Sequence, residues 1–247
     1  MFEILQKAQR LKQEEGVREV ARRAPSYAFR RAKKPYIEFK KRGSYQETRK
    51  RATRERWQLI RERIDSNDVS LVDIGCNAAE LTAKAEQEGL VSVGVDRPVC
   101  NGIPDAIQKA KELDRLSIVV GDVTPENVDR YSEYDVILLL SVYHHWWRQF
   151  GEDGAKSMLE SFKGANKVFF EPASKQTKYT AYNESELEVS PPPIEDFDSE
   201  SIISYNTRHL KSVFGNSYSV SYLGATARGE YRDGDRHLFV AEKIDTS

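Results

Sequence analysis

The stretch Leu71-Val-Asp-Ile-Gly-Cys-Asn-Ala-Ala-Glu80 decides the fold of this chain. Ser70 to Ile74 is a short apolar run typical of a buried strand, and Ala78 to Glu88 has the apolar spacing of a helix. The turn between them contains one glycine, Gly75, which lets the backbone pass close to a ligand without a side-chain clash. The pattern predicts a strand, a ligand-binding turn and a helix in direct succession.

The alternation of strands and helices continues along the chain. Further strands are predicted at Val91–Val95, Ser117–Val120, Asp135–Leu140 and Lys167–Phe170, and further helices at Ile103–Leu113, Pro125–Tyr131 and Asp153–Phe162. Near the end, Tyr218–Gly224 and His237–Lys243 have no helix between them and predict an antiparallel hairpin. The chain is therefore predicted to form a doubly wound α/β domain, with a mostly parallel sheet and helices on both faces.

Acidic residues stand at the ends of the first three predicted strands. These residues are Asp73, Asp96 and Asp122. In open α/β sheets, ligands bind outside the carboxyl ends of the strands, and a carboxylate after the second strand accepts hydrogen bonds from ribose hydroxyls. A carboxylate after the third strand can receive an adenine amino group. The three positions together predict a site for a nucleoside-containing cofactor.

These residues resemble the motifs of the class I (Rossmann-like) S-adenosylmethionine (SAM)-dependent methyltransferases, and the resemblance covers residues 68–243. Asn77 and Ala79 stand where the family's acidic-x-Gly-x-Gly-x-Gly motif has its second and third glycines, and asparagine tolerates a left-handed backbone. NAD needs bare backbone near its pyrophosphate, so the missing glycines favour SAM. The resemblance implies a seven-stranded sheet whose last strand inserts antiparallel beside the fifth.

The resemblance also implies how SAM is held. Asp73 lies near the methionine amino end, Asp96 on the ribose, and Asp122 with Val123 on the adenine. The cofactor-binding residues expected are Asp73, Gly75, Cys76, Asn77, Asp96, Arg97, Asp122, Val123 and Ser141. No metal site is expected, because no His/carboxylate cluster has ligand spacing and the chain has only two cysteines.

The segment Leu140-Ser-Val-Tyr-His-His-Trp-Trp147 resembles the Ser-x-x-His-His loop of several methyltransferases, where it faces the methyl group and the acceptor. His145 or His144 is predicted to be a general base, because imidazole titrates near neutrality. Glu171, after the fifth strand, is the third catalytic candidate. Expected substrate residues are Tyr143, Trp146, Arg228 and Arg236, and the arginines suit a carboxylate or phosphate. Alternatively, these histidines and aromatics serve the core, Glu171 caps the next segment, and the arginines aid solubility.

The N-terminal quarter of the chain is strongly basic. Residues 1–63 carry 20 Lys and Arg against 8 Asp and Glu, a net charge of +12, while the rest carries −13. Two domains are predicted, a basic helical segment over 1–66 and a methyltransferase domain over 67–247. Helices are expected at 1–24 and 46–64, the second packing through Trp57, Leu59, Ile60 and Ile64. A basic arm favours an anionic partner, or is a solvated face that neutralises the acidic body.

The arm also bears on the acceptor. Ile4–Ala24 resembles leader helices of archaeal and bacterial enzymes of surface-glycan assembly, and an amphipathic basic segment can lie on an anionic membrane surface. This implies methylation of a hydroxyl or carboxylate oxygen of a sugar in a surface-glycan or lipid-linked precursor. An RNA methyltransferase is the alternative, with arm aromatics stacking on bases. A non-catalytic SAM-binding protein is a third hypothesis, which the three strand-end carboxylates disfavour.

The expected location is cytoplasmic, peripheral to the inner face of the membrane. No apolar run approaches the ~20 residues that a membrane-spanning helix needs. The N-terminus lacks the long apolar stretch of a secretory signal. The sequence leaves the oligomeric state open.

Overall fold

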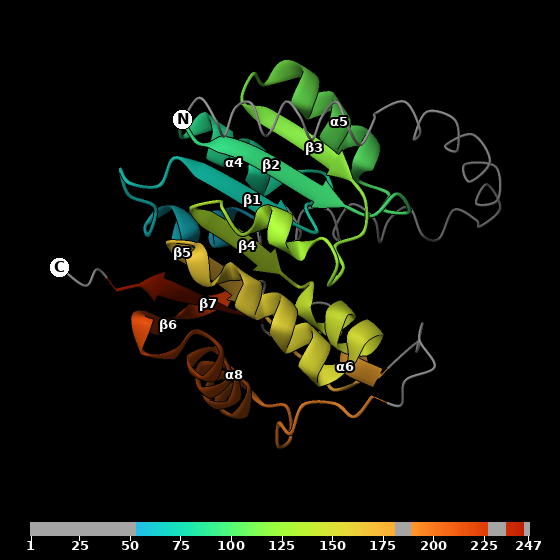
Figure 1. Ribbon diagram of the computed structural model, residues 1–247, viewed down its shortest axis with the longest axis vertical. Helices are drawn as coiled ribbons and strands as arrows, with labels where there is room; N and C mark the ends of the chain where they lie inside the picture. The colour runs from blue at the N-terminus through green and yellow to red at the C-terminus, as the bar shows by residue number, and fades with distance from the viewer. Residues whose placement is uncertain (1–52, 181–188, 227–235, 245–247) are drawn as a thin grey trace.

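A seven-stranded sheet forms the centre of the molecule, with helices on both faces (Figure 1). The computed structural model describes residues 53–180, 189–226 and 236–244. The strand order is β3-β2-β1-β4-β5-β7-β6. The strands are β1 (Ser70–Ile74), β2 (Val91–Asp96), β3 (Leu116–Val120), β4 (Val136–Leu140), β5 (Lys167–Glu171), β6 (Tyr218–Thr226) and β7 (Arg236–Lys243).

Strands β1 to β5 are parallel, and β7 is antiparallel to both β5 and β6. Every residue of β1, β4 and β5 is buried, as expected for strands that are covered on both faces. The predicted α/β fold is therefore confirmed, together with the terminal hairpin and the insertion of the last strand beside the fifth.

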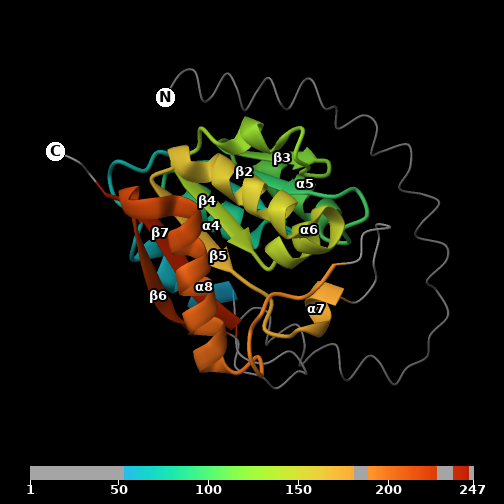
Figure 2. The same ribbon diagram turned by 60° about the horizontal axis from the view of Figure 1, so that its bottom comes forward.

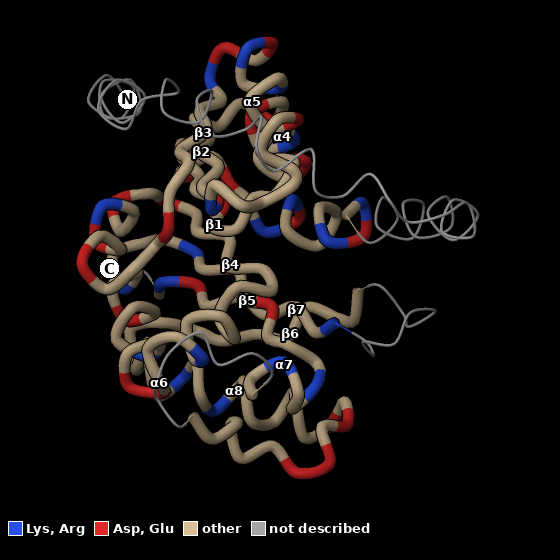
Figure 3. The backbone as a smooth tube through the Cα atoms, turned by 90° about the vertical axis from the view of Figure 1, so that its right-hand side faces the viewer, with Lys and Arg blue, Asp and Glu red and all other residues tan. Residues whose placement is uncertain are grey.

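The helices divide between the two faces of the sheet (Figures 2 and 3). They are α4 (Glu80–Gln87), α5 (Ile103–Glu112), α6 (Tyr143–Glu160), α7 (Thr177–Thr180) and α8 (Ser199–Phe214). Helices α6 and α8 bury Trp147 and Leu210 in the cluster that covers one face. On the other face, α4 and α5 pack through small residues such as Ala83 and Ala106, so these helices lie close to the strands.

Three predicted helices differ in the structure. Helix α6 begins at Tyr143, not at residue 153, and a non-helical residue, Gly151 (φ 74°), divides it, so the prediction found only its second half. The segment predicted as helix Pro125–Tyr131 forms a 3₁₀ turn over Val128–Tyr131. Helix α8 was not predicted, although Asp198 caps it by accepting a hydrogen bond from the Ser201 backbone.

Residues 53–61 form a helix that packs on the same face as α4. Trp57 and Ile60 are buried among strand residues, and Leu59 and Ile64 pack partly buried beside them, as predicted. This end of the basic segment is therefore part of the packed domain. The remainder of the predicted N-terminal segment, residues 1–52, lies outside the described residues, so the predicted boundary at residue 66 stays a prediction.

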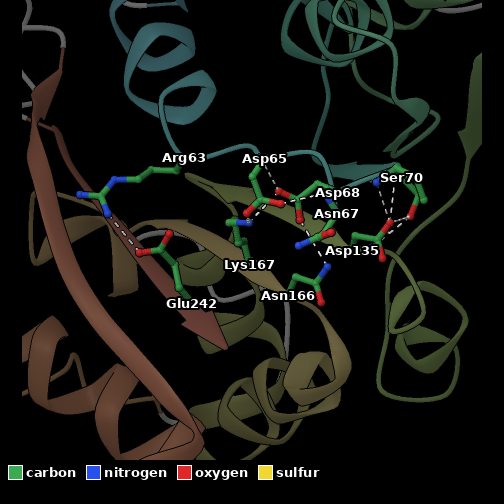
Figure 4. Close-up of polar contacts among 10 residues, drawn as sticks. Arg63, Asp65, Asn67, Asp68, Ser70, Asp135, Asn166, Lys167 and Glu242 are labelled. Carbon is green, nitrogen blue, oxygen red and sulfur yellow. Dashed lines mark hydrogen bonds and ion pairs between the residues drawn. The ribbon is translucent and has the colours of Figure 1, made fainter. Parts of the chain in front are cut away.

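A buried ion cluster fixes the chain between this helix and β1 (Figure 4). Nζ of Lys167 on β5 lies 2.7 Å from Oδ2 of Asp65 and 2.7 Å from Oδ2 of Asp68. The side chains of Lys167 and Asp68 are 9% and 0% exposed, whereas that of Asp65 is 53% exposed. Nearby, Asp135 accepts hydrogen bonds from Ser70 Oγ and two backbone N–H groups. The amino ends of the strands are thus held by charge as well as by packing.

Replacing Asp68 by alanine is expected to lower the free energy of unfolding by about 3 kcal/mol, because Lys167 then keeps only a half-exposed partner. Urea unfolding measures this loss. Arg63→Gln, which breaks the more exposed pair with Glu242, is the control and is expected to cost less than about 1 kcal/mol. Equal effects of the two substitutions would contradict the role of the buried cluster.

Candidate functional site

A cavity of about 1320 Å³ opens at the carboxyl ends of the parallel strands. Its wall is made by the segments after β1, β2, β3 and β4, by the first turn of the helix over 53–61, and by Arg236 at the start of β7. From the centre of the sheet, β1, β2 and β3 follow one another toward one edge, and β4, β5 and the later strands lie toward the other edge. The cavity lies between β1 and β4, where the strand order reverses. Ligands of open α/β sheets bind at such a point.

The cavity wall contains every residue predicted to bind the cofactor. These are Asp73, Gly75, Cys76, Asn77, Asp96, Arg97, Asp122, Val123 and Ser141. Four separate segments of the chain, at the ends of β1, β2, β3 and β4, supply them, and the topology of the sheet brings those segments together.

The loop between β1 and α4 has a left-handed backbone at alternate residues. The φ angles are 79° at Gly75, 52° at Asn77 and 54° at Ala79. These are the positions at which the resemblance places three glycines, and the left-handed conformation expected of Asn77 is confirmed. A left-handed alanine costs about 1 kcal/mol, so packing around the fully buried Ala79 holds this shape.

Two glycines let the walls of the cavity meet. A Cβ on Gly75 would overlap Cγ2 of Val142 in the segment after β4. A Cβ on Gly102, at the start of α5, would lie 2.5 Å from the backbone nitrogen of Ala78. Gly102 was not predicted, because its need for a bare backbone comes from a contact with a loop over 20 residues earlier in the chain.

The carboxylate after β2 is fixed by the loop. Oδ2 of Asp96 accepts a hydrogen bond from the backbone of Asn77 at 2.7 Å, and Oδ1 accepts one from the backbone of Arg97 at 2.7 Å. Each carboxylate oxygen has a second lone pair for a ligand hydroxyl. The side chain of Asp122 is 56% exposed and lies 4.0 Å from Nε of Arg97, at the outer part of the same cavity.

Asp73 is a buried carboxylate with few partners that stabilise its negative charge. Its Oδ2 accepts a hydrogen bond of 2.8 Å from Thr82 Oγ1. Burial raises the pKa of Asp73 to about 6, and the nearby Asp96 adds to this, while Thr82 and Arg56 act in the opposite direction. A buried carboxylate of this kind gains stability from a cation placed beside it.

The two histidines do not form the loop that was predicted, because they lie in the first turn of α6. His144 is buried outside the cavity wall, and burial lowers its pKa to about 2. Its Nδ1 has no hydrogen-bond partner within the described ranges. The structure does not place His144 to act as a base on a ligand in the cavity.

His145 does line the cavity, beside Trp146. Its Nδ1 lies 2.6 Å from Nη2 of Arg148. A guanidinium only donates, so Nδ1 accepts and the ring proton is on Nε2. Burial, with Arg148 next in importance, lowers the pKa of His145 to about 4. At neutral pH this arrangement suits a hydrogen-bond donor, and not the general base that was predicted.

Two of the four predicted substrate residues line the cavity. They are Trp146 and Arg236. Tyr143 lies in the core, where its hydroxyl is 2.8 Å from Nε2 of His209 on α8, so its predicted contact with substrate is corrected to a packing role. Arg228 lies outside the described residues.

Glu171 is completely buried behind the cavity wall. Nε of Arg56 lies 2.7 Å from its Oε2, and Nη1 of Arg236 lies 3.1 Å from its Oε1. Ser141 Oγ donates to Oε1, and Thr226 Oγ1 donates to Oε2 at 3.3 Å. Burial alone would raise the pKa of Glu171, but Arg56 and Arg236 outweigh it and hold the pKa below its usual value.

The predicted catalytic contact of Glu171 with an acceptor is therefore corrected. The carboxylate holds two arginines that themselves line the cavity. Arg56 was not predicted, because nothing in the sequence distinguishes it from the other basic residues of the N-terminal segment.

The strand order and the antiparallel last strands are those of the class I methyltransferase fold. The chain matches no protein-family model and no curated protein. Among solved structures, the bifunctional kinase-methyltransferase WbdD is similar with a TM-score of 0.56 and 16% identity, over 76% of this chain and 39% of that chain. This chain thus corresponds to about two-fifths of the WbdD chain.

Two further structures share the fold. Magnesium protoporphyrin IX methyltransferase (ChlM) from Synechocystis PCC 6803, with bound SAM, has a TM-score of 0.53 and 16% identity, over 96% of this chain and 97% of that chain. The methyltransferase domain of a bacterial Hen1 has a TM-score of 0.50 and 16% identity, over 76% of this chain and 97% of that domain. Because the identity is 16% in each case, these comparisons establish the fold alone.

Gly102→Ala is expected to destabilise the protein by about 2 kcal/mol and to displace the loop over 75–79, because a methyl group has no room beside Ala78. Gly121→Ala is the matched control, since a Cβ at Gly121 meets nothing within 4 Å. Thermal or urea unfolding compares the two. A Gly102→Ala protein as stable as the control would show that the loop and α5 can separate at little cost.

Proposed function

We propose that this chain is a SAM-dependent methyltransferase and that the cavity at the carboxyl ends of the strands binds SAM. The observation that carries the proposal is the placement of Asp73, Asp96 and Asp122 around one cavity beside a left-handed loop. SAM bears an ammonium, a ribose and an adenine, which are groups that the three strand-end carboxylates can accept hydrogen bonds from. The presence of bound SAM in the similar ChlM structure supports this choice.

Each part of the cavity has a role in holding SAM. Asp73, which is buried and has few partners for its negative charge, would face the methionine ammonium. Asp96 would accept from the ribose hydroxyls, since its hydrogen bonds to the backbone fix its orientation. Asp122 and Val123 would face the adenine. When bound, SAM supplies an activated methyl group, and the protein contributes mainly alignment of the acceptor with that methyl group.

A dinucleotide fits this cavity less well. NAD binding relies on bare backbone at a glycine-rich turn next to the pyrophosphate. Here Asn77 and Ala79 carry side chains, and Ala79 is fully buried as the residue before α4. At the loop itself, the buried carboxylate of Asp73 disfavours a pyrophosphate and favours a group with a positive charge.

For the acceptor, we propose an oxygen of a sugar in a surface-glycan or lipid-linked precursor, methylated at the inner face of the membrane. The resemblance of Ile4–Ala24 to the leader helices of surface-glycan enzymes supports it, and so does the net charge of residues 1–63. No helix within 53–180, 189–226 or 236–244 has the length and apolar character needed to cross a membrane. RNA is the alternative acceptor, since a basic arm with aromatic residues also suits phosphates and bases.

Transfer of labelled methyl groups into a cell extract distinguishes these acceptors. The extract is fractionated into lipid-linked sugar, RNA and protein after incubation with the full chain and labelled SAM. Label in the lipid-linked sugar supports the glycan proposal, and label confined to RNA overturns it.

Calorimetry tests the cofactor directly. The full chain is expected to bind SAM, and Asp96→Ala is expected to weaken binding about 30-fold, because hydrogen bonds from the ribose to a charged acceptor are lost. Asp114→Ala replaces an aspartate outside the cavity wall and is expected to leave binding unchanged. No binding of SAM by the native chain, or no effect of Asp96→Ala, would remove the proposal.

The affinity for SAM is expected to fall as the pH is lowered through about 6. Asp73 is protonated below that pH in the SAM-free protein, and the neutral acid no longer attracts an ammonium. Between pH 7 and pH 5 the dissociation constant should rise roughly tenfold. Asp73→Asn should bind more weakly at pH 7 but without this dependence on pH. A flat profile in the native protein would place the ammonium elsewhere.

A further inference from the structure

Two arginines in the cavity wall and the buried glutamate behind them form a charged cluster that has no role in the cofactor contacts proposed above. The cluster consists of Arg56 on the helix over 53–61, Glu171 at the end of β5 and Arg236 at the start of β7. The side chains of Arg56 and Arg236 are 15% and 33% exposed, whereas Glu171 has none of its side chain exposed. One carboxylate between two guanidinium groups leaves a net charge of +1 facing the cavity.

The glutamate is committed to its neighbours. Its Oε1 accepts hydrogen bonds from Arg236 and Ser141, its Oε2 accepts one from Thr226, and Nε of Arg56 lies 2.7 Å from Oε2 as an ion pair. Glu171 is therefore a positioning residue that orients two cations. It cannot take a proton from an acceptor while it makes these contacts.

The arginines still have donors available. Arg56 contacts Glu171 through Nε, and Arg236 contacts Glu171 and Ser141 through Nη1. Within the part of the chain that the structure describes, no hydrogen bond engages the terminal nitrogens of Arg56 or Nε and Nη2 of Arg236. Guanidinium groups that line a cavity, are held by a buried anion and have N–H groups left over suit bidentate binding of an oxyanion.

The cluster borders the place where the reaction would occur. Ser141, which joins Arg236 to Glu171, follows β4, and the next residue, Val142, packs on Gly75 of the cofactor loop. On the same wall, His145 turns its basic nitrogen to Arg148. Beside the cluster, the wall thus offers two cations and an imidazole whose basic nitrogen is engaged. An acceptor that is already an anion needs no base.

We propose that the methyl acceptor is an oxyacid, a carboxylate or a phosphate, which Arg56 and Arg236 hold by its oxygen atoms. This inference rests on the proposed methyltransferase function. A lone pair of the acid oxygen forms the bond to the methyl carbon, the bond between that carbon and sulfur breaks, and its electron pair stays on sulfur. No proton moves, and the product is a methyl ester.

The carboxylate of SAM itself is the competing occupant of the cluster. Arg56 is close enough to Asp73 to affect its pKa, so it lies toward the methionine end of the proposed SAM site. Arg236 contacts the other oxygen of Glu171 and Ser141 after β4, and no effect of Arg236 on the pKa of Asp73 accompanies that of Arg56. Substitutions at Arg236 therefore separate the two occupants.

The chemical stability of the transferred label tests the acceptor class. After incubation of the full chain with methyl-labelled SAM and cell extract, the product is divided into three parts, one of which stays untreated. Mild alkali releases methanol from a carboxylate methyl ester, and aqueous hydrofluoric acid releases it from a methyl phosphate. Release by either treatment supports the proposal and identifies which acid is used. Label that resists both treatments is on a hydroxyl, nitrogen or carbon and overturns it.

Variants of Arg236 test the role of the cluster. Arg236→Gln is expected to reduce label transfer about 100-fold, because two charge-assisted hydrogen bonds are lost, while SAM affinity changes less than about threefold. Arg236→Lys, which keeps the charge and the pairing with Glu171, is expected to recover about tenfold of that loss. Arg63→Gln removes an ion pair between the turn after the helix over 53–61 and Glu242 near the end of β7, and is the matched control.

Three results are decisive. Undiminished transfer by Arg236→Gln overturns the proposal, and so does an equal loss of SAM affinity, which would assign the cluster to the cofactor. A loss of transfer that Arg236→Lys does not relieve at all, with native stability in both variants, also contradicts it. If the native chain fails to bind SAM, the proposed function itself is wrong, and calorimetry reports this separately.

Discussion

The pairing of Glu171 with Arg56 and Arg236 is the interaction on which the rest of the structure depends. It joins the helix over 53–61, the end of β5 and the start of β7, three segments that are distant in the sequence. A carboxylate with no solvent exposure is tolerated only with such partners. Because the two cations also form the cavity wall, the contact that closes the fold on this side also sets the charge presented to a ligand.

The cavity wall therefore carries charges of both signs. Asp73 and Asp96 place carboxylates at the ends of β1 and β2, and Arg56 and Arg236 place cations beside Glu171 at the end of β5. A cationic cofactor and an anionic acceptor would each find a complementary surface, and their own charges would draw them together. The division follows from the strand order, since β4 separates the two groups of strands.

Local sequence predicted what depends on local structure. Strand-end carboxylates such as Asp73 and Asp96 could be placed because parallel strands end at one edge, and the left-handed backbone of Asn77 follows from its residue type. What escaped prediction depends on distant contacts. Gly102 is explained only by Ala78, and Glu171 acquires its role from residues 56, 141, 226 and 236. The two histidines were misassigned because the start of α6 carries no capping side chain to mark it.

The alternating left-handed residues at positions 75, 77 and 79 have a consequence for how such chains are recognised. The shape usually encoded by three glycines is encoded here by one glycine, an asparagine, and an alanine that its surroundings hold in place. Backbone shape and residue identity are therefore separable at this loop, so a chain can keep the geometry without the three glycines. Similarity among such chains is then easier to detect in the path of the backbone than in the sequence.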